Sequence, residues 1–501
     1  MNPDPGALLK SADPASAEAV FRAVAIAVRR GFAAQALPFA EAGARDHPHD
    51  ARLWQVLGLA HRRLDDLEPA VAALTKAAAL APADALIAHG VARATMEAGL
   101  PATGLFERAH GLAPNDGSVL LGLAAARFAD GDLDGAIAGI EAQLERHPGW
   151  IDGHNVSARL RWVRGEREGF TQSLERALLA VPGEPMLWRA LVDTLMHAGD
   201  YAAAAEAIGR GRAAAGESLV FDALAAVCAA ETGETEAADQ LFARLGPIEH
   251  VTMAARYMRH LLRAGRPEQA SAFADAWEGR DPDQLLVPYR SAAWRLTGDE
   301  RWQWLEGDER LVGVYDLADR LPPPDALAAR LRALHLSSHH PLDQSLRGGT
   351  QTDGPLFSRI EPEIRALRRA IAEAVEAHVA QLPPPVAGHP TLIAQRAPIG
   401  FSGSWSVRLT DAGFHVNHVH PAGWLSSALY ITLPGAVAEG EQGWLKLGEP
   451  QAELGLGLAP FRTVEPKAGR LVLFPSTMWH GTIPFAAGER MTVAFDVARP
   501  Q

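Results

Sequence analysis

The chain has almost no cysteine, because Cys228 is the single one among 501 residues. One cysteine cannot close an intrachain disulfide or build a thiolate metal cage, so we expect a reducing compartment and a place for Cys228 in a helix core. Long hydrophobic runs are also missing, since no segment reaches the roughly 18 uninterrupted apolar residues of a membrane span. The start of the chain lacks a basic segment followed by an apolar one. We therefore expect a soluble, cytoplasmic protein with no membrane partner.

Positive charge is in short supply as well. Lys and Arg total 47 against 60 Asp and Glu, which gives a net charge of -13. A nucleic-acid backbone requires clustered positive charge, so we do not expect nucleic acid as a partner. The length, in contrast, is ample for more than one domain, and size does not limit the burial of a core.

Prolines recur at a nearly constant spacing in the N-terminal part, which is rich in Ala, Leu and Arg. Successive prolines lie 34, 32, 34 and 34 residues apart, at Pro48, Pro82, Pro114, Pro148 and Pro182. A period of about 34 residues is typical of the tetratricopeptide repeat, a helix-turn-helix unit. Small residues also recur where the two helices of a unit would cross, at Ala70, Ala102, Ala136, Ala204, Ala238 and Ala270, with Phe170 as an exception. The sequence predicts an all-α solenoid of seven or eight units over residues 15–310.

Such a solenoid presents an extended surface, so we expect it to hold a protein or peptide, although it could serve only as a scaffold. Arg127, Arg161 and Arg164 lie near inner-helix positions and could hold a carboxylate. Charged side chains on helices are more often simply solvated.

The sequence pattern changes after Pro322–Pro324. A helix is predicted near 360–380, and short β-type runs punctuated by Gly and Pro follow residue 390. We expect strands at 391–394, 405–409, 424–433, 444–447, 471–474 and 491–497. Short strands without long helices between them favour an antiparallel barrel or a jelly roll. We therefore expect a second domain over residues 325–501, with supporting helices and a site inside its mouth.

Three histidines of this second domain predict a metal site. His418 and His420 close a strand-like run, and residues at i and i+2 on a strand point to the same face. His480 would be the third ligand, arriving from a distant strand. Non-heme iron oxygenases use two His and one carboxylate, so either this chain has three His ligands or Asp411 or Glu441 supplies an acid. His415 has the opposite parity and is expected behind the ligands or at the surface.

Arg490 follows His480 by ten positions, and Thr492 lies two residues later on the same strand face. A guanidinium forms a fork for a carboxylate, and a buried hydroxyl adds one hydrogen bond, so this pair could hold the far end of a dicarboxylate. Tyr430 could add a phenol to the same carboxylate. The alternatives are a surface-turn Arg490 paired with Glu489 or Asp496, and a Tyr430 that only fills the core.

Together these residues carry a family resemblance. From about Leu334 the chain resembles the 2-oxoglutarate-Fe(II) oxygenases that follow tetratricopeptide repeats. The matching stretches are Gln344–Thr352, His418–Pro421, Trp424–Ser426, Gly469–Ser476 leading to His480, Gly488–Arg490 and Ala494–Asp496. The resemblance implies a double-stranded β-helix, with Fe(II) at the three histidines and 2-oxoglutarate chelating the iron. It also implies that Arg490 holds the distal carboxylate of 2-oxoglutarate.

The expected function is that of an Fe(II)- and 2-oxoglutarate-dependent dioxygenase that uses O2 to hydroxylate a protein or peptide presented by the repeats. One alternative is a protein-interaction scaffold whose barrel is idle. Another is a three-His dioxygenase that does not use 2-oxoglutarate. The Gln344–Thr352 stretch, which contains Gly348 and Gly349, could form a lid over the site or an ordinary connecting loop.

Overall fold

The computed structural model describes residues 4–342, 344–438 and 440–500. The chain divides into two compact units, one made of residues 1–143 with 353–365 and the other of residues 144–352 with 366–501. None of the helices in the described residues combines the length and the apolar character that a membrane crossing requires. The expected boundaries, 15–310 and 325–501, stay predictions.

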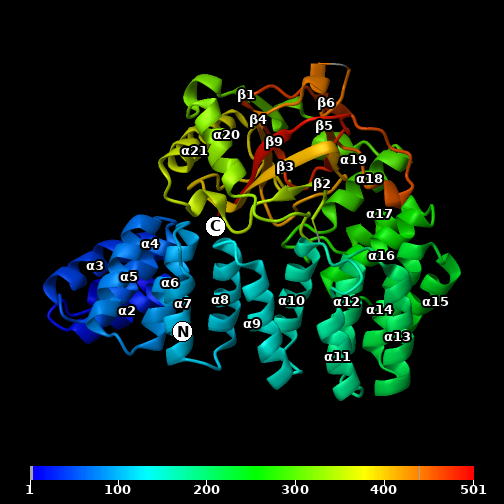
Figure 1. Cartoon of the computed structure of the whole chain (residues 1–501). Helices are drawn as coiled ribbons and strands as arrows, with labels where there is room; N and C mark the ends of the chain where they lie inside the picture. The colour runs from blue at the N-terminus through cyan, green and yellow to red at the C-terminus, as the bar shows by residue number, and fades with distance from the viewer. Residues whose placement is uncertain (1–3, 343, 439, 501) are drawn as a thin grey trace. The chain divides into compact units, whose positions relative to one another are not determined.

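The first unit is helical (Figure 1). Its helices are α1 (Pro5–Ser11), α2 (Ala17–Arg29), α3 (Ala33–Asp46), α4 (Ala51–Arg63), α5 (Leu67–Leu80), α6 (Ala85–Glu97), α7 (Thr103–Leu112) and α8 (Gly117–Ala129). The next helix, α9 (Leu133–Arg146), contains the point at which the two units divide.

The second unit continues the same alternation of helices. They are α10 (Ile151–Arg164), α11 (Gln172–Ala180), α12 (Pro185–His197), α13 (Tyr201–Ala215), α14 (Leu219–Thr232), α15 (Thr235–Leu245), α16 (Val251–Arg263), α17 (Pro267–Asp275), α18 (Val287–Thr297) and α19 (Arg301–Glu306). A further helix is α20 (Pro324–Ala333), and α21 (Pro362–Gln381) begins in the first unit and continues in the second. From α2–α3 to α16–α17 the described helices form eight consecutive pairs, which agrees with the predicted seven or eight repeats.

The turns between the pairs confirm the repeat register. Each of the five periodic prolines lies in a turn that separates one helix pair from the next. A donor six residues after the proline closes some of these turns: Trp54 Nε1 donates to Pro48 O at 3.0 Å, and Trp188 Nε1 donates to Pro182 O at 2.8 Å. Proline at this place ends the preceding helix because it cannot supply a backbone donor.

Close helix crossings explain the small residues of the repeats. All six predicted alanines are buried, with at most 2% of their surface exposed. Gly58 in α4 faces α5 so closely that a Cβ atom there would lie 2.5 Å from Leu74 Cγ and 3.0 Å from Ala70 O. A side chain at Gly58 would therefore force the two helices apart. Cys228 is buried in α14, as expected.

The C-terminal part of the second unit forms two antiparallel sheets. The six-stranded sheet has the order β1-β7-β4-β9-β3-β2, and the three-stranded sheet has the order β6-β5-β8. The strands are β1 (Gly313–Asp316), β2 (Leu346–Gln351), β3 (Phe401–His415), β4 (Leu425–Thr432), β5 (Leu445–Leu447), β6 (Arg462–Val464), β7 (Arg470–Pro475), β8 (His480–Thr482) and β9 (Arg490–Val497). This is the predicted jelly-roll architecture, in which two sheets enclose a core.

Apolar side chains from both sheets meet between them. Val472 and Phe474 of β7 pack in one cluster with Leu445 and Leu447 of β5. The residue next to His480, Trp479, is 2% exposed, and its Nε1 donates to Pro288 O of α18 at 3.0 Å. The core thus fixes the strands that carry the predicted ligands, and α18 is part of their support.

Two of the predicted segments have a different structure. Residues 391–394 do not form a strand, because the backbone N–H groups of Thr391 and Leu392 both donate to His389 Nδ1 at 3.0 Å. A side chain that captures backbone donors in this way favours a turn. The Gln344–Thr352 stretch, expected as a lid or a loop, is mostly the edge strand β2, paired with β3.

Candidate functional site

The structure brings His418, His420 and His480 together. One ring nitrogen from each lies within 4.8 Å of the other two, and these residues form a group that could hold a metal ion. His418 and His420 follow the end of β3 and are not part of a regular strand, contrary to the prediction. An isolated antiparallel bridge joins His418 to His480, the first residue of β8.

Backbone hydrogen bonds hold the three residues in place. The N–H of His418 donates to His480 O at 2.9 Å, and the N–H of His480 donates to His418 O at 3.0 Å. The N–H of His420 donates to Ser476 O at 2.9 Å. A Cβ atom at Gly481 would lie 2.1 Å from Asn417 Oδ1, so only glycine permits this approach of the two segments.

Each imidazole has its Nδ1 atom held by an oxygen. The contacts are His418 Nδ1 to Val416 O at 2.9 Å, His420 Nδ1 to Asp496 Oδ2 at 2.7 Å and His480 Nδ1 to Met478 O at 3.0 Å. Because a carbonyl or carboxylate oxygen only accepts, Nδ1 carries the proton and the Nε2 lone pair remains for a ligand. Metal-bound histidines are oriented in this way by their second nitrogen.

Protonation does not compete with metal binding at two of these rings. Burial lowers the pKa of His480 to about 3, with the nearby His420 ring adding to the effect. Burial and the neighbouring His480 and His420 rings hold the pKa of His418 well below its ordinary value. These two imidazoles are therefore neutral at physiological pH, as metal ligation requires.

Asp496 supplies a carboxylate directly behind His420. Its Oδ2 atom accepts from His420 Nδ1, and its Oδ1 atom accepts from Ser426 Oγ at 2.6 Å. On the other side, the Trp405 ring stacks on His420 with 5.5 Å between ring centroids. The sequence prediction considered Asp496 only as a partner of Arg490. Asp496 and Arg490 are an even number of residues apart on β9, so their side chains point to the same face of the strand. This spacing could have placed Asp496 in the pocket from the sequence alone.

The structure places Arg490 in the same pocket, where only 2% of its surface is exposed. It forms no ion pair with a described carboxylate: Glu489 pairs with Arg332 and Arg408 instead. Among the described residues no group accepts from Arg490 Nε. Burial lowers the pKa of Arg490 below its ordinary value. A buried cation without a counter-ion, facing a cavity, is an arrangement that fits an anionic ligand.

Thr492 and Tyr430 take different positions around Arg490. Thr492 lines the pocket from the same face of β9. Tyr430 is fully buried in the core between the sheets, with the Arg490 Cζ atom 5.1 Å from its ring centroid. Its hydroxyl has no hydrogen-bond partner in the described part of the chain. Burial raises the pKa of Tyr430, so the phenol keeps its proton and can donate it.

The remaining lining of the pocket includes residues that the sequence did not single out. Ser345 Oγ lies 3.0 Å from His415 Nδ1 and 3.2 Å from His418 Nε2. His415 lines the pocket and stacks on His418, so it lies beside the predicted ligands. Alternate residues of β9 line the same wall, namely Arg490, Thr492, Ala494 and Asp496. The two-residue period of a strand accounts for this set.

Other candidates lie elsewhere. Glu441 is exposed and does not line the pocket, and the side chain of Asp411 lies outside the described residues. Arg161 and Arg164 both pair with Glu166. Arg127 donates to Gly135 O and pairs with Glu107. These three arginines are thus engaged by the protein itself.

The two sheets form a jelly-roll domain, and its pocket contains a group of three histidines that could hold a metal ion. Residues 403–496 match the family model described as "Putative 2OG-Fe(II) oxygenase". This stretch of the C-terminal domain is therefore similar to the 2OG-Fe(II) oxygenase family, and the match covers less than half of the chain. A search of curated proteins finds no match.

Solved structures that are similar to parts of the chain include the following two. One is a tetratricopeptide repeat protein from Parabacteroides merdae, with 17% identity, a TM-score of 0.31, and coverage of 48% of this chain and 96% of that chain. Another is a Pseudomonas putida prolyl-4-hydroxylase, with 20% identity, a TM-score of 0.26, and coverage of 42% of this chain and 100% of that chain.

Proposed function

We propose that the protein is an Fe(II)- and 2-oxoglutarate-dependent dioxygenase that hydroxylates a protein or peptide. The observation that carries this proposal is the buried Arg490, which has no counter-ion among the described residues, in one pocket with three imidazoles that are each held through Nδ1. A neutral histidine set suits a divalent metal ion, and the guanidinium suits a carboxylate. Because both features lie in one pocket, they fit a metal ion and a dicarboxylate bound side by side.

In this proposal each residue has a defined task. His418, His420 and His480 would hold Fe(II), and Asp496 would orient His420 and add negative charge behind it. Arg490 and Thr492 would bind the distal carboxylate of 2-oxoglutarate, with Tyr430 donating a hydrogen bond beside them. When bound, Fe(II) and 2-oxoglutarate supply the chemistry that inserts one oxygen of O2 into a C–H bond and leaves succinate and CO2.

Among the described residues, the site has no ionised ligand of the kind that most members of this superfamily provide. The placement of Asp496 offsets part of that loss, because a carboxylate bonded to Nδ1 makes the imidazole a more basic ligand. The Trp405 and Phe474 rings pack on His420 and His480 and limit access of water to them.

Helical repeats in the same chain support a polypeptide as the substrate, because such arrays offer long surfaces for an extended segment. The cytoplasmic location expected from the single cysteine remains part of this proposal. The boundaries 15–310 and 325–501 are likewise proposed for the repeat and oxygenase domains.

Two alternative functions can be distinguished from this one by experiment. A three-His dioxygenase without 2-oxoglutarate is favoured by the all-histidine ligand set, and its activity would survive the change Arg490→Ala. A scaffold with an idle barrel would bind no metal, and its cellular role would survive His480→Ala.

The deciding experiment measures succinate release by full-length protein that is loaded with Fe(II) without oxygen and then titrated with 2-oxoglutarate and air. We expect metal-dependent succinate formation that saturates with 2-oxoglutarate and disappears in His480→Ala. Absence of metal-dependent 2-oxoglutarate turnover in the wild-type protein, alone or with peptides, would overturn the proposal.

A further inference from the structure

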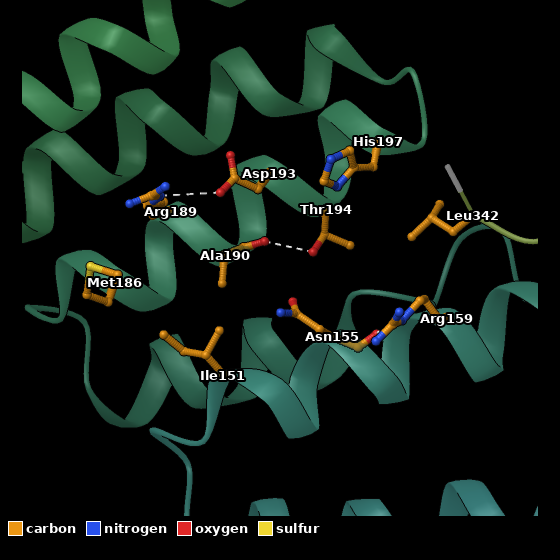
Figure 2. Close-up of a pocket in the computed structure, with 10 residues that line it drawn as sticks. All are labelled: Ile151, Asn155, Arg159, Met186, Arg189, Ala190, Asp193, Thr194, His197 and Leu342. Carbon is orange, nitrogen blue, oxygen red and sulfur yellow. Dashed lines mark hydrogen bonds and ion pairs between the residues drawn. The ribbon is translucent and has the colours of Figure 1, made fainter. Parts of the chain in front are cut away.

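A second cavity lies in the repeats, between α10 and α12 of the second unit. Its volume is about 470 Å³, within the range of about 300–1,000 Å³ that is usual for ligand sites. Ile151, Asn155 and Arg159 line one side from α10, and Met186, Asp193 and His197 line the other from α12 (Figure 2). We call this cavity the α10–α12 groove.

One further residue of the groove comes from a distant part of the chain. Leu342 lines the groove and packs with buried residues of α10 to α14. Gln344 and Ser345 already belong to the histidine pocket, where Ser345 contacts His418. Chain geometry keeps the Cα atoms of Leu342 and Gln344 within about 7 Å of each other. A residue of the groove and a residue of the candidate metal site are therefore close neighbours along the chain.

Three arginines lie in the groove or near the segment of chain that leads from it to the pocket. Arg159 stands in the groove, and Arg347 donates to Gln344 O and Leu346 O at 2.8 Å on the pocket side. Arg167 stacks on Trp162, with its Cζ atom 3.6 Å from the ring centroid, and burial together with the nearby Arg347 lowers the pKa of Arg167. None of these three arginines forms an ion pair with a carboxylate in the described residues. Nearby acidic residues form ion pairs with other arginines: Glu166 pairs with Arg161 and Arg164, and Asp193 pairs with Arg189.

The groove also offers groups for a peptide backbone and for apolar side chains. No described group pairs with the side-chain amide of Asn155, which Figure 2 shows pointing from α10 towards α12. An amide offers both a donor and an acceptor, the pair that an extended backbone requires. Ile151, Met186 and Leu342 supply apolar surface beside it, and Met186 is 46% exposed.

We propose that the α10–α12 groove binds an extended, acidic polypeptide segment and directs it past Leu342 and Gln344 to the histidine pocket. This inference rests on the proposed function, because it names the class of substrate that would reach the histidine pocket. The groove supplies the anchoring, through Asn155 to the backbone and Arg159 to an acidic side chain. Arg167 and Arg347 keep the segment attracted as it approaches the pocket.

The test uses the full-length protein and three fluorescein-labelled peptides of equal length, built from repeated Glu-Leu-Ser, Gln-Leu-Ser or Lys-Leu-Ser triplets. Fluorescence anisotropy without iron measures their binding. We expect the Glu peptide to bind most tightly, and Arg159→Glu to weaken it about tenfold, since like charges placed together oppose binding. Asn155→Ala should weaken the Glu and Gln peptides by a similar factor, because both share the same backbone.

Arg244→Glu provides the matched control, because Arg244 is exposed on α15, outside the groove, and the substitution changes the net charge equally. A loss of Glu-peptide binding in Arg244→Glu as large as in Arg159→Glu would overturn the proposal, as would equal binding of all three peptides. Tighter binding of a labelled single-stranded oligonucleotide, with the same dependence on Arg159, would also overturn it by showing a nucleic-acid site.

A benzophenone group on the Glu peptide gives an independent readout by mass spectrometry of the crosslinked residues. Crosslinks to α10, α12 or the segment around Leu342 support the groove, and crosslinks confined to other helices contradict it. Succinate formation without peptide separates the two proposals. If succinate forms but Arg159→Glu leaves peptide binding unchanged, only the groove is wrong. If peptides bind as expected but no succinate forms, only the proposed function is wrong.

Discussion

Buried cations and histidines behave differently in the helical repeats and in the β domain. In the repeats, Arg259 donates to Glu231 through Nε and Nη2 at 2.7 and 2.8 Å. His154 has both ring nitrogens engaged, by Ser173 Oγ at 3.0 Å and Pro148 O at 2.9 Å. In the β domain, Arg490 is as deeply buried but has no counter-ion among the described residues, and His480 is held through Nδ1.

The difference separates side chains that stabilise the fold from side chains that await a ligand. A buried polar group normally has its partners within the protein, since an unpaired one costs free energy. Where the pairing is incomplete inside a cavity, the missing partner is expected to come from outside. The predictions below test this distinction by making equivalent changes in both regions.

The largest effect is expected from His480→Asn, compared with His154→Asn. Loss of a direct metal ligand should lower the affinity for Fe(II) by more than the 10- to 100-fold typical of outer partners. His154→Asn should leave the metal content unchanged and lower the melting temperature. Metal analysis after anaerobic reconstitution measures the first quantity. Equal metal content in the wild-type protein and His480→Asn would remove the distinction between the two histidines.

Next is Arg490→Leu, compared with Arg259→Leu. Breaking the buried pair with Glu231 should cost about 3–5 kcal/mol of unfolding free energy, whereas removing the unpaired Arg490 should raise that free energy by about 1 kcal/mol or more. The affinity for 2-oxoglutarate should fall about 100-fold in Arg490→Leu, since a carboxylate loses its buried partner. Urea unfolding and 2-oxoglutarate titration measure these effects. A large destabilisation in Arg490→Leu would show that Arg490 is structural.

Asp496→Asn should have a smaller effect. The amide can still accept from His420 Nδ1 but no longer adds negative charge, so the metal affinity should fall about 10- to 100-fold. Competition with a chelator, using Co(II) as a spectroscopic probe, measures the change. Glu231→Gln in the repeats is the control and should lower stability without altering the metal affinity. An unchanged Co(II) spectrum and affinity in Asp496→Asn would speak against its role behind His420.

The smallest effect concerns pH and His378, which burial keeps at a pKa of about 4. An unfolded histidine has a pKa near 6.5, so between these values the unfolded state binds more protons and stability falls as the pH is lowered. His378→Phe should flatten this slope by at most about 1.4 kcal/mol per pH unit. Unfolding at pH 7 and pH 5 measures it. An unchanged slope would mean that His378 has the same pKa in the folded and unfolded states.

Periodic patterns in the sequence were enough to predict much of this molecule. The spacing of the prolines identified the helix pairs, because each unit ends at the same turn. The two-residue period of a strand placed Arg490 and Thr492 on one face, and both line the pocket. These features depend on local geometry, which a sequence records directly.

Features that depend on distant partners were not predictable in the same way. The Gln344–Thr352 stretch was expected as a lid or a loop, but most of it forms the strand β2 by pairing with the edge of β3. Gly349 lies so close to β3 that a Cβ atom there would be 2.3 Å from Arg408 O, a contact invisible in sequence. The pairing of Asp496 with His420 joins residues 76 positions apart. The roles of the three histidines and Arg490 in binding iron and 2-oxoglutarate remain proposals.

The edge strand β1 has a practical consequence for work on the β domain in isolation. It precedes α20, yet it pairs with β7 at the margin of the six-stranded sheet. A recombinant fragment that begins after Asp316 would leave β7 with bare backbone donors and acceptors, which readily recruit strands from other molecules. Such a fragment would aggregate for reasons unrelated to its chemistry. Expression should therefore begin no later than α18, which also retains the partner of the Trp479 indole.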